Sequence, residues 1–435
     1  MAEPGRVRRA LALEPGEFGP VAWSFSYFFC LLAGYYVLRP VRDEMGIQGG
    51  VDALAWVFSA TFLLMLAVVP LFGWAVRRYS RRGLVVVSYG FFIVNLFGFF
   101  VLMRSEWAPV WTARAFFVWV SVFNLFVISL FWSVMNDVFD ARQALRLFGL
   151  IAAGGSLGAI AGPGLTALLA DRLGPVNLLP VSALFLIAAT GSALAVMGSS
   201  RASRAAPSAR SRGESVWAGA LHVARSPYLL GICVFIIAYS SLSTFLYFEQ
   251  AHIVEQAFAD SARRTQIFAG MDLATNIITL ALQFFATARL VAWFGLPLAL
   301  ALIPLAVAAG FGMLGLMPTL GVLVVFQVVR RAGNYAITKP AREMLFGVVS
   351  PEDKYKAKNF IDTVVYRGGD AASGWLYSGL AALGLGLSAL AFAAMPLALA
   401  WAGVGIALGR ARRRRETVID TVHSCHPHEP ESHRS

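Results

Sequence analysis

The feature that most constrains this chain is the recurrence of apolar runs about twenty residues long, from near its start to near its end. A helix of that length crosses a hydrocarbon core of about 30 Å. Inside lipid every backbone N–H and C=O needs a partner within the protein, and these runs lack the alternating pattern of a membrane barrel. The sequence therefore predicts an all-α integral membrane protein with about twelve transmembrane helices.

The composition excludes a soluble globular protein. Of the 435 residues 58% are hydrophobic and 14% are charged, whereas a soluble domain carries about 25% charged residues. A net charge of +12 would raise the question of nucleic-acid binding in a soluble protein. Here most of the arginines fall in short connections between the apolar runs, where they set membrane orientation. The lipid bilayer, and no nucleic acid, is the expected partner.

The predicted spans form two groups of six. We expect the first group near 19–39, 53–76, 83–103, 110–136, 144–170 and 175–198, and the second near 228–250, 265–288, 294–316, 319–346, 356–385 and 387–409. A polar, basic stretch rich in Ser, Ala and Arg separates them. This pattern predicts an N-terminal half (1–198), a basic linker (199–227), a C-terminal half (228–410) and a disordered tail (411–435).

Basic residues gather in one set of connections, which the positive-inside rule places in the cytoplasm. With the N-terminus inside, these connections hold about twenty basic residues against about six on the other side. They include Arg77, Arg78, Arg81, Arg82, Arg142, Arg146, the linker, Lys354, Lys356, Arg410 and Arg412–Arg415. We expect both termini in the cytoplasm. Because no cleavage site or transit peptide is recognisable, we expect a multi-pass protein of a bacterial cytoplasmic (inner) membrane.

Two six-helix halves joined by a basic cytoplasmic linker are the plan of the major facilitator fold, whose substrate site lies between the halves at mid-membrane. Internal symmetry is visible at two corresponding places, where each half re-enters the membrane with a glycine pair. These pairs are Gly154 with Gly155, and Gly368 with Gly369. Small residues allow close helix packing, which is the role we expect for them.

An enzyme is not expected, because no nucleophile motif, phosphate-binding loop or helical zinc motif occurs in a usable context. Cys30, Cys233 and Cys425 are too far apart to suggest a disulfide framework. The tail also contains His423, His426 and His428, but a short polar tail is more often disordered than a metal site. No cofactor or metal is predicted.

Charged residues inside the spans are the informative ones, because a charge at mid-membrane is costly and usually faces a cavity or a partner. The first span ends in YYVLRPVRDEMG, which brings together Arg39, Arg42, Asp43 and Glu44. This group can be an interfacial cluster in which Arg39 reaches toward the headgroups and Arg42 pairs with a carboxylate. It can equally be part of a substrate site.

Other carboxylates suggest gating or coupling roles. Asp137 and Asp140 follow the fourth span, close to Arg142 and Arg146, and we expect them to form a cytoplasmic charge latch between helices. In the eighth span, Asp272 can bind a coupling proton or can be the counter-ion of an arginine in the tenth span. The counter-ion is the favoured interpretation.

The tenth and eleventh spans contain a dense set of basic groups. Arg330 and Arg331 open the set, and at helical spacing Arg331, Asn334, Tyr335, Lys339 and Arg342 follow one face. Guanidinium forks match carboxylate and phosphate oxygens, so this stripe predicts a positively charged cavity for an anion. In the eleventh span the spacing predicts pairs between Lys358 and Asp362 and between Arg367 and Asp370.

Three stretches resemble the ATP/ADP antiporter family, the nucleotide transporters of plastids and intracellular bacteria, including its relatives in free-living bacteria. They are YYVLRPVRD, then LFWSVMND with ALRLFGLIAAGG, and most specifically KPAREMLFGVVSPEDKYKAKNFIDTVVYRGGD. The resemblance implies a twelve-helix exchange carrier for a nucleotide or related anion. It places Arg42 at the family's substrate-contacting lysine and matches its charges at Arg342, Lys358 and Arg367.

The sequence departs from the family pattern in two places. No Asp or Glu occurs between Arg114 and Asp137, where the nucleotide exchangers have an acidic residue, and Asp370 stands where they have a lysine. The second difference reverses a charge at a position that the resemblance assigns to phosphate.

The leading hypothesis is a monomeric secondary transporter that moves a small anionic solute, such as a nucleotide or another phosphorylated compound, by alternating access. Its predicted substrate-binding residues are Arg39, Arg42, Arg331, Asn334, Lys339, Arg342, Lys358 and Arg367, and its gating or coupling residues are Asp137, Asp140, Asp272, Asp362 and Asp370. The alternative is a proton-coupled permease or exporter of a neutral or amphipathic solute, with Asp272 or Asp370 as the proton site. A membrane module that anchors a partner is a third, weaker interpretation.

Overall fold

The computed structural model describes residues 14–199, 220, 223–285, 287–350, 357, 358 and 360–425. Within these ranges the regular structure is entirely helical. Ten of the described helices are long and apolar enough to cross a membrane. The predicted all-α membrane fold is thereby confirmed.

The first half of the chain forms six long helices. They are α2 (Phe18–Gln48), α3 (Leu54–Arg78), α4 (Arg81–Arg104), α5 (Pro109–Val138), α6 (Ala141–Leu173) and α7 (Leu178–Ser199), with short 3₁₀ turns η1 (Val51–Ala53) and η2 (Pro175–Asn177). Each of the six overlaps one predicted span. Their apolar composition fits the rule that lipid-exposed backbone must be satisfied within the helix.

Among the described residues, the second half contains three continuous helices, one helix with a kink and two composite ones. The continuous helices are α9 (Pro227–Ala257), α10 (Ser261–Phe285) and α16 (Leu387–Cys425), and α11 (Thr287–Leu316) has a kink at Gly295, where φ is 71°. The predicted span 319–346 consists of α12 (Leu320–Gly333), the π-helical turn η3 (Asn334–Thr338), α13 (Lys339–Leu345) and the 3₁₀ turn η4 (Phe346–Val348). The span predicted at 356–385 contains the π-helical turn η5 (Ile361–Val365) and α15 (Tyr366–Ala382). These two spans carry the highest density of intramembrane charge.

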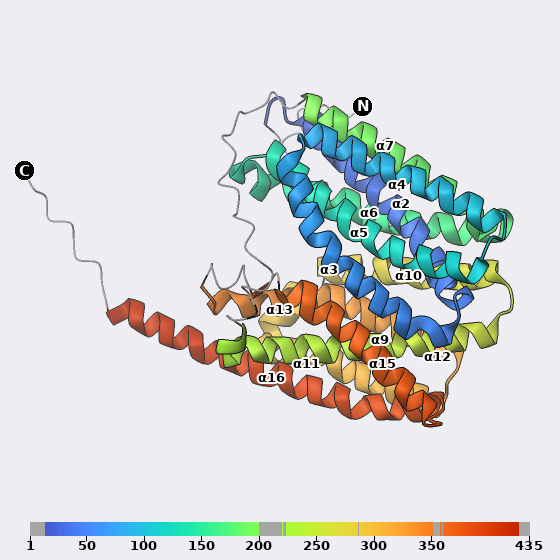
Figure 1. Cartoon of the computed structure of the whole chain (residues 1–435). Coiled ribbons are helices and arrows are strands. Elements are labelled where there is room, and N and C mark those ends of the chain that lie inside the picture. Colours follow the sequence, from blue (N-terminus) through green and yellow to red (C-terminus); the bar gives the residue numbers. More distant parts are fainter. Residues whose placement is uncertain are drawn as a thin grey trace, which may run out of the picture.

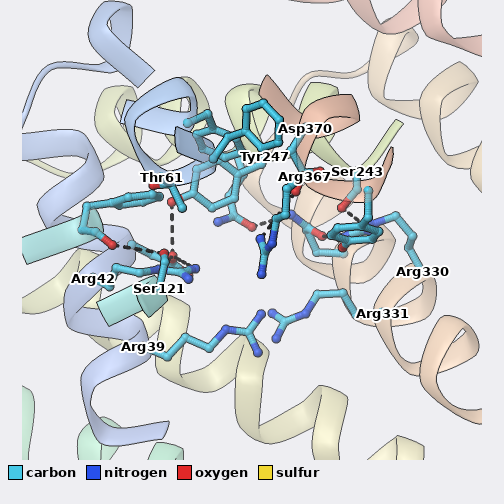
Figure 2. Close-up of a pocket in the computed structure, with 17 residues that line it drawn as sticks. Arg39, Arg42, Thr61, Ser121, Ser243, Tyr247, Arg330, Arg331, Arg367 and Asp370 are labelled. Atoms are coloured by element: carbon cyan, nitrogen blue, oxygen red, sulfur yellow. Dashed lines mark hydrogen bonds and ion pairs between the residues drawn. The ribbon is translucent and has the colours of Figure 1, made fainter. Parts of the chain in front are cut away.

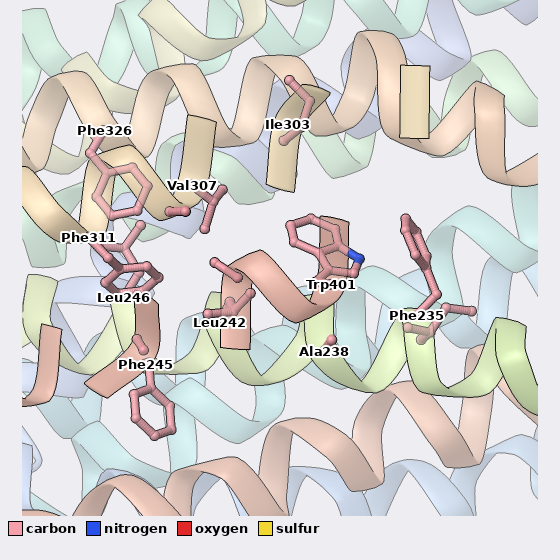
Figure 3. Close-up of a cluster of buried hydrophobic side chains, with 14 of the residues drawn as sticks. Phe235, Ala238, Leu242, Phe245, Leu246, Ile303, Val307, Phe311, Phe326 and Trp401 are labelled. Carbon is pink, nitrogen blue, oxygen red and sulfur yellow. The ribbon is translucent and has the colours of Figure 1, made fainter. Parts of the chain in front are cut away.

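The two halves lie side by side, with α2–α7 in the upper part of Figure 1 and α9–α16 in the lower part. Each has its own hydrophobic core. Figure 3 shows part of the second core, where Phe235, Phe311 and Trp401 bring α9, α11 and α16 together. We call the end of the bundle where α7 ends and α9 begins the linker end, and the end where α2 ends and α3 begins the loop end.

Glycines of α6 allow this helix to lie directly against α2. A Cβ atom added to Gly154 would lie 2.5 Å from the Phe25 carbonyl oxygen, and one added to Gly162 would lie 2.6 Å from the carbonyl oxygen of Ala33. Gly158 faces the carbonyl of Phe29 even more closely. The packing role expected for Gly154 therefore holds, and it extends along three turns of α6.

The glycine pair of the second half behaves differently. A Cβ atom on Gly369 would lie 2.9 Å from the Ser240 hydroxyl oxygen of α9, so this glycine also permits close helix packing. At Gly368 the nearest atoms belong to the Phe62 ring at 3.6 Å, which is ordinary van der Waals contact. The expected packing role thus fits Gly369 and not Gly368.

Two predicted boundaries were wrong. The first span was expected to end near residue 39, but α2 continues through the charged run to Gln48, because its charged side chains find partners inside the protein instead of at the membrane surface. The tail was expected to be disordered from 411, but α16 continues to Cys425, with an i,i+4 pair between Arg412 and Glu416. His426 and His428 lie outside the described residues.

We predict that Gly158→Val destabilises the protein, because the added side chain meets the α2 backbone and overpacking of this kind costs about 1–3 kcal/mol. Thermal unfolding in detergent measures the effect. Gly149→Ala is the matched control on the same helix, where an added Cβ meets nothing within 4 Å. Equal melting temperatures for wild type and Gly158→Val would contradict the close α2–α6 packing.

Candidate functional site

A polar cavity of about 180 Å³ lies between the two halves. Five arginines line it: Arg39, Arg42, Arg330, Arg331 and Arg367. Its other polar lining residues are Asp43, Thr61, Ser121, Ser243, Tyr247, Gln250, Gln327, Tyr366 and Asp370. Figure 2 shows the arginines approaching the cavity from both halves, with Arg39 and Arg331 directed toward one another. The cavity thus lies where the major facilitator plan predicts a substrate site.

The extension of α2 beyond its apolar run places two of these arginines. Arg42 pairs with Asp43 at 2.6 Å and lies over the Phe117 ring of α5, 5.0 Å from its centroid. Asp43 also accepts a hydrogen bond from the Tyr247 hydroxyl of α9 at 3.1 Å. The predicted pairing of Arg42 with a neighbouring carboxylate is present, but it lies at the cavity and links the two halves through Asp43 and Tyr247.

Asp272 of α10 joins arginines from both halves. Its Oδ1 accepts a hydrogen bond from Arg331 of α12 at 2.5 Å, and its Oδ2 lies 3.7 Å from Nε of Arg39 of α2. The Asp272 side chain is 1% exposed. It is therefore a counter-ion, as favoured from the sequence, and the charge that it neutralises is shared between the halves.

Arg330 differs from the other cavity arginines because its hydrogen-bond partners are neutral. Its guanidinium donates to the Ser243 hydroxyl and to the Gln327 side-chain oxygen, both at 2.9 Å, and the residue is 6% exposed. Gln327 in turn donates to the Gln250 side-chain oxygen at 2.6 Å. Within the described part of the chain, no carboxylate pairs with Arg330. A buried cation with only neutral partners beside a cavity is a strong candidate for binding an anion.

Arg367 and Asp370 form the expected pair on α15, with Nη1 and Oδ2 3.5 Å apart. Asp370 also accepts hydrogen bonds from Ser240 at 2.7 Å and Thr244 at 3.3 Å, both on α9. These bonds hold the carboxylate against the cavity wall, while Arg367 is more exposed and lies over the Tyr366 ring. Arg367 is accordingly the arginine with the greatest freedom to turn toward a solute.

The cavity carries an excess of positive charge. The five guanidinium groups outnumber the three carboxylates in contact with them, Asp43, Asp272 and Asp370, by two. Charge interactions are stronger here than in water because the surroundings are of low dielectric constant. An anion with two negative charges would neutralise this excess positive charge.

The two halves make further contacts toward the loop end. Arg264 of α10 donates from Nε and Nη2 to the two carboxylate oxygens of Glu44, each at 2.7 Å, and Glu44 is 0% exposed. Gln48 donates to Ser261 at 3.1 Å, and the Trp375 indole donates to Ser59 at 2.9 Å. These bonds close the cavity toward the loop end.

The remaining predicted substrate residues lie outside the cavity lining. Asn334 donates to the Tyr239 hydroxyl at 3.0 Å, and Lys339 is exposed. The stripe predicted from Arg331 to Arg342 is not continuous, because the π-helical turn η3 changes the angular spacing after Gly333. The structure thus brings Arg39, Arg42, Arg331 and Arg367 together and leaves Asn334, Lys339, Arg342 and Lys358 nearer the linker end.

The predicted pair between Lys358 and Asp362 was wrong. Lys358 pairs with Glu343 at 2.7 Å, and Asp362 lies 3.5 Å from Arg342, so both bonds join the tenth and eleventh spans. The charges of the eleventh span are neutralised by Arg342 and Glu343 of the tenth span, and spacing within a single span does not show such contacts between helices.

The residues of the expected latch have different partners. Asp137 at the end of α5 pairs with Arg81 of α4, and Asp140 caps the N-terminus of α6 through the backbone of Arg142 and Gln143. Arg146 pairs with Glu17 at 2.7 Å. These contacts join helices within the first half of the chain.

Several cavity residues were not among the predicted substrate-binding residues. The most important are Arg330, Gln250 and Gln327, which form one hydrogen-bonded chain. The available signal was the presence of isolated glutamines and an arginine inside apolar spans. Glutamine carries no charge, so its presence in an apolar span is a weaker sign of a polar site than a charged residue is.

Comparisons with known proteins agree with this architecture. Residues 24–354 match the family described as the Major Facilitator Superfamily. The chain is 22% identical to ADP,ATP carrier protein 2 of Chlamydia trachomatis serovar D, over 84% of this chain and 82% of that protein. It is 20% identical to ADP,ATP carrier protein 1 of Chlamydia pneumoniae, over 87% and 88%.

Among solved structures, the POT family transporter PepTSo has a TM-score of 0.65 to this chain at 12% identity, covering 91% of this chain and 98% of that one. Such a similarity shows the fold. The resemblance to ATP/ADP carriers noted in the sequence is confirmed, and the chain is a transporter and not an enzyme. Because the family match covers most of its length, this chain belongs to the Major Facilitator Superfamily of membrane transporters.

Proposed function

We propose that this protein is a secondary transporter that exchanges a small anionic solute across the membrane by alternating access. The observation that carries the proposal is Arg330, a buried guanidinium with neutral partners, in a cavity where arginines outnumber carboxylates by two. A solute with phosphate or carboxylate oxygens supplies the missing negative charge and accepts the forked hydrogen bonds that guanidinium groups donate.

A phosphorylated solute is favoured over other anions, with ADP and ATP as first candidates. The two relatives named as ADP,ATP carriers support this choice. Arg42, which stands at the family's substrate-contacting lysine, lines the cavity. Asp370 reverses the charge that the resemblance assigns to the neighbouring position, but its pairing with Arg367 leaves the overall balance of the cavity positive.

We place the linker end in the cytoplasm of a bacterium, with the protein as a monomer in the cytoplasmic membrane. The arginines at this end support the orientation. With it, Glu44–Arg264 and the other loop-end contacts lie on the outer side, so the arrangement corresponds to a transporter closed to the outside.

Ligand-dependent thermal stabilisation tests the substrate class. We expect ADP, ATP or another phosphorylated solute to raise the melting temperature of the detergent-purified protein, since a ligand at 100 times its Kd stabilises by about 2.7 kcal/mol. Neutral solutes of similar size are the control. Stabilisation by neutral solutes alone would overturn the anion assignment.

Neutralising the cavity arginines tests the site. In Arg330→Gln, Arg42→Gln and Arg367→Gln we expect affinity for the stabilising anion to fall roughly ten- to hundred-fold, because a hydrogen bond to a charged group contributes about 1.5–3 kcal/mol. Arg263→Gln, an exposed arginine on α10, is the matched control. Unchanged affinity in all three cavity variants, with normal membrane levels, would contradict the site.

The loop-end ion pair tests alternating access. Breaking it with Glu44→Gln leaves Arg264 without its carboxylate partner, and we expect a cysteine placed at Ser59 to become more reactive toward an impermeant thiol reagent added outside. Arg263→Gln again serves as control. If labelling does not increase, Glu44–Arg264 does not hold the outer side closed.

The alternative is a proton-coupled permease for a neutral or amphipathic solute. The observation that favours this alternative is that two carboxylates, Asp43 and Asp370, line the cavity. Each of them, and Asp272, already forms an ion pair with an arginine. The proton site proposed from the sequence, Asp272 or Asp370, therefore has less support than the anion site.

A further inference from the structure

Glu249 of α9 is a buried carboxyl group that lies outside the transport site. The residue is 1% exposed. Its Oε1 accepts a hydrogen bond from the Tyr377 hydroxyl of α15 at 3.3 Å, and its Oε2 is buried without a hydrogen-bond partner. Phe245 and Phe248 pack on the Tyr377 ring beside it. These surroundings are apolar and do not compensate a negative charge.

The other buried carboxyl groups in the described part of the chain all have arginine partners. Glu17 pairs with Arg146, Asp43 with Arg42, Glu44 with Arg264, and Asp272 with Arg331. No arginine, lysine or histidine among the described residues forms an ion pair with Glu249. An isolated ionised carboxylate in such a place costs several kcal/mol, and a carboxyl group in that position takes up a proton instead.

Most charged groups on the elements packed against α9 have partners elsewhere, and Asp52 of η1 and Glu255 of α9 are exposed. On α9 itself, His252 lies one turn further on and its Nδ1 contacts the Phe248 carbonyl oxygen. The remaining groups have the partners described above: Asp43 and Glu44 of α2, Arg330 and Arg331 of α12, Asp362 of η5, and Arg367 with Asp370 of α15. The arginines of α16, Arg410 and Arg412–Arg415, lie at the linker end.

The position of Glu249 connects it to the anion site. Gln250, the next residue, lines the cavity and binds Gln327, which accepts from Arg330. Glu249 is thus one residue from a hydrogen-bonded chain that ends at the arginine with neutral partners. A change of charge at Glu249 would act on this chain through a medium of low dielectric constant, in which charge interactions are strong.

We propose that Glu249 is a proton-binding site that couples proton movement to transport. In the conformation described here it holds a proton. The step is a proton transfer alone: the carboxylate takes up H⁺ from water and later returns it, and no other bond changes. The coupling rests on the proposed function, whereas the presence of the proton does not.

Infrared spectroscopy of the detergent-purified protein tests the proton directly. At neutral pH we expect a carboxylic-acid C=O stretching band in the wild type that is lost in Glu249→Gln. Glu255→Gln, an exposed glutamate on the same helix, should keep the band. Tyr377→Phe should shift the band without removing it, because it removes the hydroxyl donor. An identical band in wild type and Glu249→Gln, or no band in either, would overturn the proton site.

Transport into proteoliposomes tests the coupling. With labelled ADP as probe, we expect an acid-outside pH gradient to stimulate uptake at least twofold in wild type and Glu255→Gln, and not in Glu249→Gln. Stimulation that persists in Glu249→Gln would overturn the coupling. If wild type takes up no ADP, the proposed substrate is wrong, and the infrared result still decides whether Glu249 holds a proton.

Discussion

The ion pairs of Asp272 are the interaction on which the arrangement of the two halves depends. Asp272 lies between Arg39 of the first half and Arg331 of the second. Lipid offers no alternative partner for any of these three charges, so each half needs the other to neutralise its own intramembrane charge. Under the proposed function, an anion that enters the cavity would compete with Asp272 for the same guanidinium groups. Binding of substrate and contact between the halves would then be linked by shared charges.

Much of the fold could be predicted from the sequence. Twelve apolar runs, the basic linker and the distribution of arginines were sufficient for the helical class and the two-half plan, because lipid permits few other solutions. The predicted end of the first span was wrong because the charged residues that follow it have partners inside the protein. The sequence of α2 reads as a span that stops before Arg39, and nothing local shows that Arg264 and Asp272, more than two hundred residues away, allow the helix to continue.

The candidate site was predicted in part. Four arginines at the cavity, Arg39, Arg42, Arg331 and Arg367, stand out as charges in apolar surroundings. Residues after Gly333 were misplaced because the prediction assumed uniform helical spacing. The sequence does not show how Arg330 differs from its neighbour Arg331. Among the described residues Arg330 has no carboxylate partner, and this property depends on which side chains the other helices place beside it.

The π-helical turns η3 and η5 limit the insertions and deletions that this protein can tolerate. Each accommodates residues that an α-helix of the same length would have no room for, so the side chains on its two sides are rotated about the helix axis relative to the α-helical register. Deleting one residue from Asn334–Thr338 would restore that register and turn Arg342 and Glu343 away from their partners Asp362 and Lys358. Length and sequence identity would hardly change, yet the charges at the linker end would no longer meet. In this transporter, single-residue insertions and deletions within these two turns are accordingly equivalent to changing several charged side chains at once.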